Sequence, residues 1–476
     1  MSLQVYNRYK GRKEEFQPVH DGKVGIYFCG MTVQDKPHMG HMLAFVAGDM
    51  IRRYLKFTGY DVKYVQNFTD VDDKIISKAN DEGIEFTEVA QRNIDEYFRF
   101  AGELNIIPAD IYPRATEHID DIIGLISKLE EKGFAYKGGS DVYYRVRKFP
   151  AYGKLSGRII DDLQSGARIE VGDEKEDPLD FTLWKGAKEG EPAWDSPWGP
   201  GRPGWHIECS VMSMKYLGET LDMHGGGMDL VFPHHENEIA QSEAVTGNEY
   251  VKYWMHNGLL NLSGEKMSKS TGHFFLIEDI LKEFSGEVVR FYFLSTHFRS
   301  NSEFGRERLA EAAAGFERIK EFCTRLDEAR GASDGGEGWD DKIDALVAGV
   351  REDFMASMND DFNGAEAVGH IFHLIRELNV MTGGNIAKLA EFPRSLEKML
   401  GDFETYDSIL GLFADGLPKA GGDDVPDEVL KMVRDREEAR ASKDWARADE
   451  LRDAILAAGF AIEDRTEGTR VSRSKD

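Results

Sequence analysis

The stretch "KVGIYFCGMTVQDKPHMGHMLAFVAGDMIRRYLKFTGYDVKYVQ" (Lys23–Gln66) contains the three elements that decide the fold. Its first apolar run, residues 23–33, predicts a buried strand that leads into a glycine-containing turn. Residues 41–59 carry apolar side chains at helical spacing, and residues 60–66 predict a second strand. Strand, helix and strand in this order indicate a right-handed parallel crossover, the unit of doubly wound sheets, whose functional loops follow the carboxyl ends of the strands.

The pattern changes several times along the rest of the chain. After about Pro113 it breaks up into a hairpin-bearing insertion, and the α/β pattern resumes at Trp205 and continues to about His297. Periodic helical segments and glycine-rich linkers follow. We predict an α/β fold: a Rossmann-like doubly wound parallel sheet with an inserted connective domain, followed by a C-terminal helical bundle and a small terminal domain. The predicted divisions are 1–112 and 201–260 for the two halves of the Rossmann-like domain, 113–200 for the insertion, 261–300 for a junction, 301–420 for the bundle and 421–476 for the terminal domain.

The composition narrows the class of protein. A chain of 476 residues is too long for one compact core, and about three domains are expected. No stretch approaches the roughly 18 apolar residues that span a bilayer. Residues 1–13 lack the apolar segment of a secretory signal, and three scattered cysteines fit a reducing compartment, so we expect a cytoplasmic protein. The net charge of −27 argues against nucleic-acid binding over the whole surface and leaves room for a local basic patch.

The residues "HMGH" (His38–His41) lie between the first strand and its helix. Imidazoles near a helix N-terminus can meet the negative charge that develops on a phosphate, with support from the helix dipole. Gly40 has no Cβ, so a flat purine could lie close to the backbone there. A helix start with two surface histidines explains the same four residues equally well.

A second candidate is "EKMSKS" (Glu265–Ser270), which lies in a small polar segment flanked by Gly264 and Gly272. Lys266 and Lys269 suit the pyrophosphate that leaves a nucleoside triphosphate, because lysine acts as a movable point charge. Considered alone, the pattern is explained more simply as a solvated loop.

HxGH near the first crossover, with KMSKS after the last sheet strand, is the signature of class I aminoacyl-tRNA synthetases. Other stretches narrow the resemblance: "TDVDDKII", "RPGWHIECS", "HGGGMDLVFPHHENEIAQSEA", "KMSKSTG" and the terminal "ARASKDWARADELRD" are similar to the cysteinyl-tRNA synthetases. The resemblance covers essentially the whole chain. It implies ATP with Mg²⁺, L-cysteine and cysteine tRNA as ligands, no membrane partner, and a chain that acts as a monomer.

The segment "PHHENEIAQSEA", which begins at Pro233, predicts a helix with proline in its first turn. His234 and Glu238 then lie at i and i+4 on one face, where both can reach one metal ion. Two ligands make only half of a tetrahedral site, so a solvated His/Glu pair is the alternative. His235 and Glu236 are expected to point away from the metal.

Two cysteines supply the missing half. Cys29 ends the first strand, and we expect Cys209 at the entrance to the third strand; each alone is more often a buried core thiol. In cysteinyl-tRNA synthetases the matching four positions bind zinc, which implies one Zn²⁺ per chain held by Cys29, Cys209, His234 and Glu238. Cys323 matches no ligand and is expected in the core.

The chemistry of the substrate gives the metal a purpose. Cysteine differs from serine by sulfur for oxygen, and hydrophobic contacts discriminate such pairs by only about 1–3 kcal/mol. Zinc binds a thiolate strongly, so direct coordination of the substrate sulfur would reject serine without an editing site. The sequence contains no large insertion that would house such a site.

The resemblance implies further contacts. Asp229 matches the carboxylate that holds the ATP ribose, Trp205 and His224 match walls of the cysteine pocket, and Thr69 matches a polar contact to the amino end of the substrate; structural support is the alternative for each. The implied catalytic and ATP-binding set is His38, Gly40, His41, Asp229, Lys266 and Lys269. Arg440, Trp445, Asp449 and Asp464 match positions that meet the anticodon, where an exposed Trp can stack on an unpaired base. A small helical cap with a core Trp is the alternative there.

The expected function is therefore ATP-dependent ligation of cysteine to its tRNA through a cysteinyl-adenylate. One rival is the paralogous ligase of mycothiol synthesis, which joins cysteine to an amino-sugar inositol and has no anticodon-reading end. A second rival is a non-catalytic zinc- or tRNA-binding paralogue. Residues 421–476 argue against the first rival, and the complete HMGH, KMSKS and ligand sets argue against the second.

Overall fold

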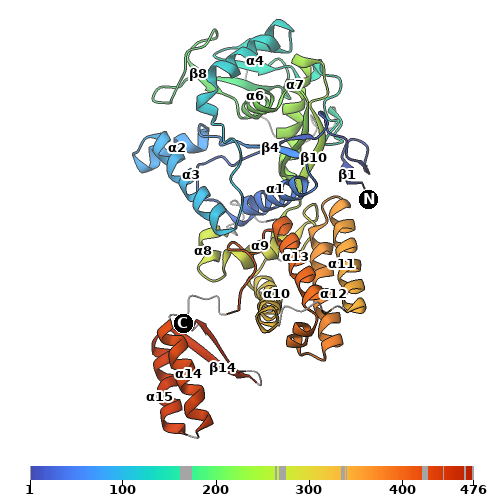
Figure 1. The fold of residues 1–476 in the computed structure, drawn as a ribbon. Helices are drawn as coiled ribbons and strands as arrows, with labels where there is room; N and C mark the ends of the chain where they lie inside the picture. Colours follow the sequence, from blue (N-terminus) through green and yellow to red (C-terminus); the bar gives the residue numbers. More distant parts are fainter. Residues whose placement is uncertain are drawn as a thin grey trace. The chain divides into compact units, whose positions relative to one another are not determined.

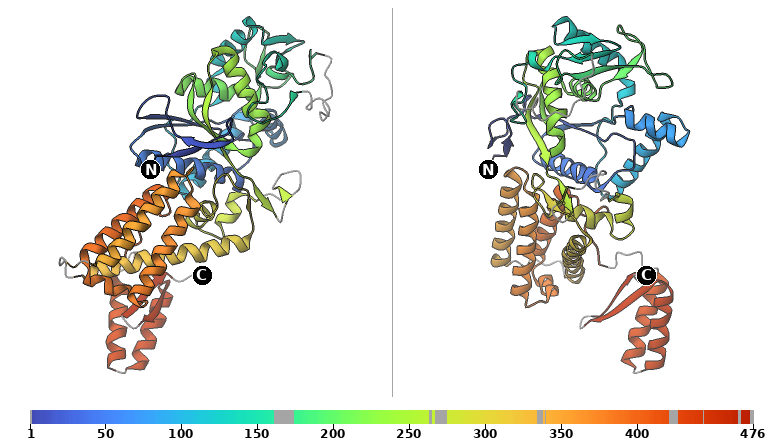
Figure 2. Two further views of the ribbon diagram at one scale, coloured as in Figure 1. Left: turned by 90° about the vertical axis from the view of Figure 1, so that its right-hand side faces the viewer. Right: turned by 180° about the vertical axis from the view of Figure 1, so that it is seen from behind.

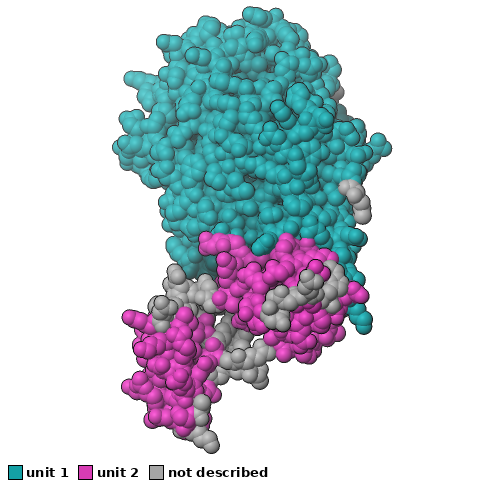
Figure 3. Space-filling model, in the orientation of Figure 1, with its two compact units in different colours: residues 1–317, 342–377, 404–414 teal, residues 318–341, 378–403, 415–476 magenta. Residues whose placement is uncertain are grey.

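The computed structural model describes residues 2–160, 174–262, 265–266, 275–333, 338, 340–420, 427–442, 444–465 and 468–473. The chain divides into two compact units (Figure 3). The first comprises residues 1–317, 342–377 and 404–414, and the second comprises residues 318–341, 378–403 and 415–476.

A four-stranded parallel sheet of order β10-β9-β3-β4 forms the centre of the first unit (Figure 1). Its strands and the helices that connect them are β3 (Lys23–Phe28), α1 (Met39–Phe57), β4 (Asp61–Gln66), α6 (Trp205–Leu217), β9 (Leu221–Gly227), α7 (Glu236–Thr246) and β10 (Val251–Asn257). The crossover predicted from β3 through α1 to β4 is confirmed. Because the chain leaves β3 and β9 in opposite directions across the sheet, the crevice for a ligand is expected where these two strands end.

Helices cover both faces of this sheet. A Cβ on Gly25 would lie 3.3 Å from a methyl carbon of Leu217 in α6, and a Cβ on Gly48 of α1 would lie 3.0 Å from the ring of Phe28. Gly25 and Phe28 face opposite sides of β3, since successive side chains alternate along a strand. Helices α1 and α6 therefore lie on opposite faces, as the ribbon views show (Figures 1 and 2). This is the doubly wound arrangement predicted above.

The insertion contains an antiparallel sheet whose four strands follow one another in chain order. The strands and the preceding helix are α4 (Ile119–Glu131), β5 (Ala135–Gly138), β6 (Asp141–Tyr144), β7 (Phe181–Gly186) and β8 (Gly201–Pro203). One hydrophobic core joins this sheet to the parallel one, since it runs from Tyr27 and Val65 to Val142 and Trp184. The insertion thus fixes α6 and α7 from the side opposite to the sheet.

Helices dominate the rest of the chain, as predicted. They are α8 (Ile277–Leu281), α9 (Gly286–Leu294), α10 (Arg306–Ala332), α11 (Asp341–Asn359), α12 (Gly364–Thr382) and α13 (Pro393–Leu410). A separate group comprises α14 (Asp427–Ala441), α15 (Trp445–Ala457) and the hairpin of β14 (Phe460–Arg465) and β15 (Gly468–Arg473), packed around Val429, Val433, Ile455 and Phe460. Cys323 is buried in α10, as expected. Within the described ranges, no helix combines the length and apolar character needed to cross a membrane.

The remaining elements are short or peripheral. They are β1 (Gln4–Asn7), β2 (Arg12–Glu15), α2 (Asp73–Glu82), α3 (Phe86–Glu103), η1 (Ala115–Glu117), η2 (Val146–Lys148), η3 (Met228–Leu230), η4 (Val231–His235), β11 (Leu260–Leu262), β12 (Glu265–Lys266), β13 (Ser302–Glu303) and η6 (Ile386–Glu391). Of these, η3 and η4 matter most for the site because they connect β9 to α7.

Candidate metal centre and adjoining cleft

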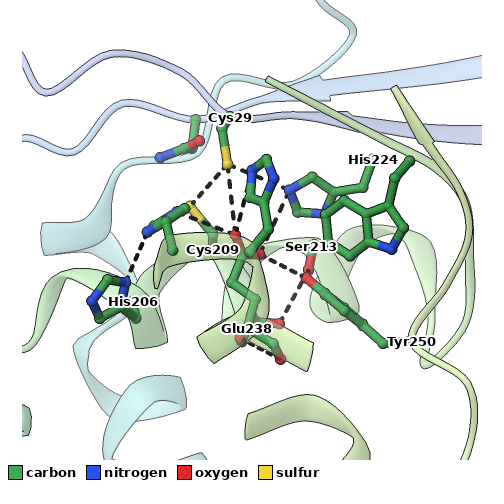
Figure 4. A network of polar contacts seen from close by, with 12 residues as sticks. Cys29, His206, Cys209, Ser213, His224, Glu238 and Tyr250 are labelled. Atoms are coloured by element: carbon green, nitrogen blue, oxygen red, sulfur yellow. Dashed lines mark hydrogen bonds and ion pairs between the residues drawn. The ribbon is translucent and has the colours of Figure 1, made fainter. Parts of the chain in front are cut away.

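Two sulfurs, a carboxylate and an imidazole meet in one buried cluster (Figure 4). The Cys29 Sγ lies 3.8 Å from the Cys209 Sγ and 3.7 Å from the Glu238 Oε1, and the His234 Nε2 lies 3.1 Å from the same Glu238 oxygen. Tetrahedral zinc with Zn–S of about 2.3 Å and Zn–N or Zn–O of about 2.0–2.1 Å would hold its ligand atoms roughly 3.3–3.8 Å apart. The two distances from Cys29 fall within this range and the distance from His234 to Glu238 is slightly shorter, so the donor set fits one zinc ion after a small adjustment of the last pair.

The elements that bring these side chains together differ from the prediction at Cys209. Cys29 follows β3, as predicted, but Cys209 lies in the middle of α6 and not at the entrance to a strand. Residues 207–213 are buried at every position although Glu208, Ser210 and Ser213 are polar, so the segment has no apolar face whose period would identify a helix. The helix begins after Gly204, ends at Gly218 and packs on β3, which places the two cysteines side by side.

The helix that carries His234 and Glu238 also begins differently from the prediction. Regular α7 starts at Glu236 and not at Pro233, because Phe232 has extended backbone angles (φ −142°, ψ 130°) and kinks the chain within η4. His234 and Glu238 nevertheless face each other across one turn, as expected.

The prediction that His235 points away from the metal is wrong. Its Nε2 lies 3.9 Å from the Glu238 Oε1, and it forms a second, overlapping group of potential ligands with Cys29, His224 and Glu238. His235 and Glu238 are spaced at i and i+3, which places two side chains on one helix face just as i and i+4 does, so both histidines can approach the same carboxylate. Glu236 does point elsewhere, since it accepts hydrogen bonds from backbone amides of the inserted domain.

Two of the four ligands are held by polar contacts with residues that lie outside the ligand set, called outer partners below. The His206 Nδ1 lies 3.0 Å from the His234 Nδ1, and the Tyr250 hydroxyl donates to the Glu238 Oε2 at 3.0 Å (Figure 4). Ser213 in turn contacts the Tyr250 hydroxyl at 2.6 Å. None of these three residues was predicted from the sequence. His206 stands three residues before Cys209 and could have been found by helical spacing, whereas Tyr250 and Ser213 carry no local signal.

Burial shifts the pKa values of the four candidate ligands. It raises the pKa of the Cys29 thiol and of the Glu238 carboxyl well above their usual values and lowers the pKa of His234 well below its own. At Cys209 the contact with Cys29 lowers the pKa, but burial and nearby carboxylates outweigh it and the net shift is upward. Burial thus favours the neutral form of each group. A divalent metal ion would supply the positive charge that favours thiolate and carboxylate forms.

A cleft of about 500 Å³ adjoins the metal cluster at the ends of β3 and β9. Its lining includes Cys29, His38, Gly40, His41, Trp205 and Asp229. The predicted helix start is confirmed: His38 is the N-cap of α1, its ring accepts from the His41 backbone amide, and the His41 ring accepts from the His38 amide. The two rings stack with their centroids 3.5 Å apart. Both histidines therefore belong to a preformed wall and not to an open surface.

Of the three residues expected to contact the substrate, Trp205 and His224 lie against the cluster. Trp205 begins α6, is 39% exposed and has its ring centroid 4.4 Å from that of His234. His224 in β9 is fully buried, with its Nε2 3.4 Å from the Cys29 Sγ. Thr69 is buried and donates to the Glu208 Oε2 at 2.9 Å, a partner that the sequence analysis missed.

A second cavity of about 690 Å³ lies beyond Trp205, between α6 and the inserted domain. Trp205 lines both cavities, and His206 and Glu208 line only the second one. The ligand-supporting residue His206 therefore stands between the metal cluster and this cavity.

The described residues include one of the two motif lysines and all four predicted anticodon residues. Lys266 has its backbone in β12, and Lys269 lies outside the described ranges. Arg440 lies in α14, Asp449 in α15, and Asp464 in β14 opposite Thr469. Trp445 begins α15 with 60% of its surface exposed and is absent from the small core, so the alternative of a core Trp is wrong.

Comparison with known proteins agrees with this arrangement. Residues 15–314 match the family model for the tRNA synthetases class I (C) catalytic domain, residues 353–414 match the DALR domain, and residues 422–471 match the cysteinyl-tRNA ligase anticodon binding domain. A cysteine–tRNA ligase of Geobacter metallireducens is 48% identical, with 98% of this chain and 99% of the relative covered. One from Heliobacterium modesticaldum is 47% identical over 99% of both chains.

Solved structures share the fold at low identity. A methionyl-tRNA synthetase of Mycobacterium tuberculosis in complex with methionyl-adenylate matches with a TM-score of 0.64 at 16% identity, over 83% of this chain and 91% of that one. A putative arginyl-tRNA synthetase of Campylobacter jejuni matches with a TM-score of 0.56 at 14% identity, over 82% and 93%. The matched catalytic domain, the anticodon domain and the full-length similarity to the curated relatives show that this chain belongs to the cysteine–tRNA ligase family.

Proposed function

We propose that this protein ligates L-cysteine to cysteine tRNA in an ATP-dependent reaction, as a cytoplasmic monomer that uses one Zn²⁺ and ATP with Mg²⁺. The observation that carries the proposal is the convergence of Cys29, Cys209, His234 and Glu238 beside a cleft lined by His38, His41 and Asp229. A structural zinc site alone would not need this cleft, and an ATP site alone would not need buried thiols. The two features together therefore favour an ATP-dependent reaction on a substrate that zinc recognises.

The reaction follows two transfers. In the first, the cysteine carboxylate attacks the α-phosphorus of ATP, the bond to the bridging oxygen breaks, and pyrophosphate leaves. In the second, the terminal ribose hydroxyl of the tRNA attacks the carbonyl carbon of the cysteinyl-adenylate, and AMP leaves. Neither transfer needs a covalent enzyme intermediate, so positioning and charge stabilisation supply the catalysis.

The residues of the cleft suit these tasks. We assign His38 and His41 to the charge that develops on the α-phosphate, with Gly40 giving the purine access to the backbone and Asp229 accepting from the ribose hydroxyls. The motif lysines Lys266 and Lys269 are proposed to stabilise the departing pyrophosphate.

The metal ligands suit recognition of the substrate. When bound, zinc supplies a site for a thiolate that serine cannot fill. Trp205 and His224 form the wall around this position, since both lie against the cluster. Thr69 is proposed as the polar contact to the amino end of the substrate.

The terminal domain favours a tRNA over a small-molecule acceptor. Its exposed Trp445 offers a ring on which an unpaired base can stack, and Arg440, Asp449 and Asp464 are proposed to meet the anticodon with it. A ligase that joins cysteine to an amino-sugar inositol would not need a domain that reads an anticodon. We propose the domain divisions predicted from the sequence as the functional ones.

The test is aminoacylation of total tRNA with cysteine and serine, paired with zinc analysis of the same preparation. The proposal expects cysteine charging, no serine charging and one zinc per chain. Ligation of cysteine to an amino-sugar inositol without tRNA charging would overturn it.

A further inference from the structure

We infer that His206 is a positioning residue that fixes the tautomer of His234 and so sets the affinity for zinc. The inference rests on the proposed function, because it takes His234 as a zinc ligand. His206 does not belong to the ligand set itself, and its role is to hold the ring that does.

The geometry defines where the protons lie. The His234 Nε2 faces the cluster, 3.1 Å from the Glu238 Oε1, while its Nδ1 lies 3.0 Å from the His206 Nδ1. A neutral imidazole that uses Nε2 as a metal ligand carries its proton on Nδ1. The His234 Nδ1–H must therefore donate to the His206 Nδ1, which accepts only if His206 carries its own proton on Nε2. The two rings thus lock each other in the tautomers that ligation requires.

The His206 ring is itself held in place. It lies in the first turn of α6 and meets the ring of Phe181 edge-on, with centroids 5.6 Å apart at 82°. The Gln241 side chain of α7 donates to the His206 backbone carbonyl at 2.9 Å. Helices α6 and α7 are therefore joined at the residue that supports the ligand, and the acceptor on His206 is directed before any metal arrives.

A second buried histidine pair provides a matched comparison. The His235 Nδ1 lies 2.8 Å from the His256 Nε2, so His256 stands behind His235 as His206 stands behind His234. His235 belongs to the overlapping group of potential ligands that contains only one thiol. If zinc occupies the group with two thiols, only the His206 partner should affect zinc binding.

The experiment uses the full-length zinc-loaded protein titrated with a zinc-chelating indicator, which reports the zinc affinity without reference to activity. Three variants are compared with the unaltered chain: H206L, which removes the acceptor; H206N, whose side-chain oxygen can replace it; and H256L, which removes the other partner. Thermal unfolding of each metal-free variant separates zinc affinity from folding. The cobalt-substituted proteins report the thiolate-to-metal charge-transfer band.

The expected result is a zinc affinity about 10- to 100-fold weaker for H206L, with recovery in H206N and little change in H256L. H206L with unaltered zinc affinity would overturn the inference, as would an equal loss in H206L and H256L. Failure of the proposed function would be recognised separately, since the unaltered protein would then bind no zinc or charge no tRNA with cysteine.

Discussion

The His234 Nε2 lies 3.1 Å from the Glu238 Oε1, although the first residue belongs to the kinked segment η4 and the second to the regular helix α7. This pair presents two ligands from one chain segment to two cysteines, one that follows β3 and one in α6. The metal centre therefore joins the start of the chain to two neighbouring segments some 180 residues later.

Cys209→Ala should remove zinc binding and cysteine-dependent pyrophosphate exchange together. Loss of a direct ligand should cost more than the about 10- to 100-fold that loss of an outer partner costs. Zinc analysis and pyrophosphate exchange measure the two effects. Cys323→Ala is the control, since Cys323 is equally buried but lies in α10. Pyrophosphate exchange unchanged in Cys209→Ala would refute the role of zinc in cysteine recognition.

Tyr250→Phe should weaken zinc binding about tenfold, because Glu238 loses the hydroxyl that orients it. Tyr144→Phe is the control, because it removes another buried tyrosine hydroxyl. That hydroxyl donates at 2.8 Å to the carbonyl of Ala240, which lies in α7 as Glu238 does. The chelator titration should therefore separate the two variants. Equal zinc affinities would mean that the Tyr250 contact stabilises only the fold.

His38→Asn should separate helix capping from catalysis. Asparagine is a good N-cap, so the melting temperature should change little. The imidazole is lost from the cleft, and pyrophosphate exchange should fall by about 100- to 1,000-fold, as when one transition-state donor is removed. A melting temperature that falls as steeply as the activity would assign His38 to structure alone.

Zinc binding should release protons and tighten as pH rises. Burial raises the pKa of Cys29 and Glu238, and the pKa of Cys209 is also raised, so the metal-free protein favours their protonated forms. Ligation requires the deprotonated forms, so protons should leave as zinc binds. Calorimetry in buffers of different ionisation enthalpy counts them. Cys209→Ala should release fewer protons than the unaltered chain, whereas zinc binding without proton release would contradict the assignment.

Trp445→Ala should raise the KM for tRNA and leave cysteine-dependent pyrophosphate exchange unchanged. Stacking on one base is worth about 1–3 kcal/mol. Leu456→Ala in the same helix is the control, because Leu456 is similarly exposed, at 56%. An unchanged KM in Trp445→Ala would remove this ring from the anticodon contacts.

Much of the fold was predictable because its signals are local. The apolar runs of β3, α1 and β4 have distinct periods, and their order fixes a parallel crossover. The ligand set was not predictable in this way, since nothing near Cys29 or Cys209 in the sequence identifies a partner 180 residues away. Only the resemblance to a family joined them to His234 and Glu238.

The errors have physical causes too. The prediction for His235 considered only the i,i+4 pair of His234 and Glu238, whereas the i,i+3 spacing of His235 and Glu238 also brings those two side chains together. Cys209 was misplaced because a run buried on all sides has no face to reveal its period. His206 and Tyr250 were missed because an outer partner is defined by contacts across the fold.

The most direct test of the central claim is zinc X-ray absorption spectroscopy of the enzyme alone, with cysteine and with serine. We expect two sulfur ligands in the free enzyme, from Cys29 and Cys209, a third sulfur when cysteine binds, and no change with serine. A sulfur count that stays the same when cysteine binds would contradict it.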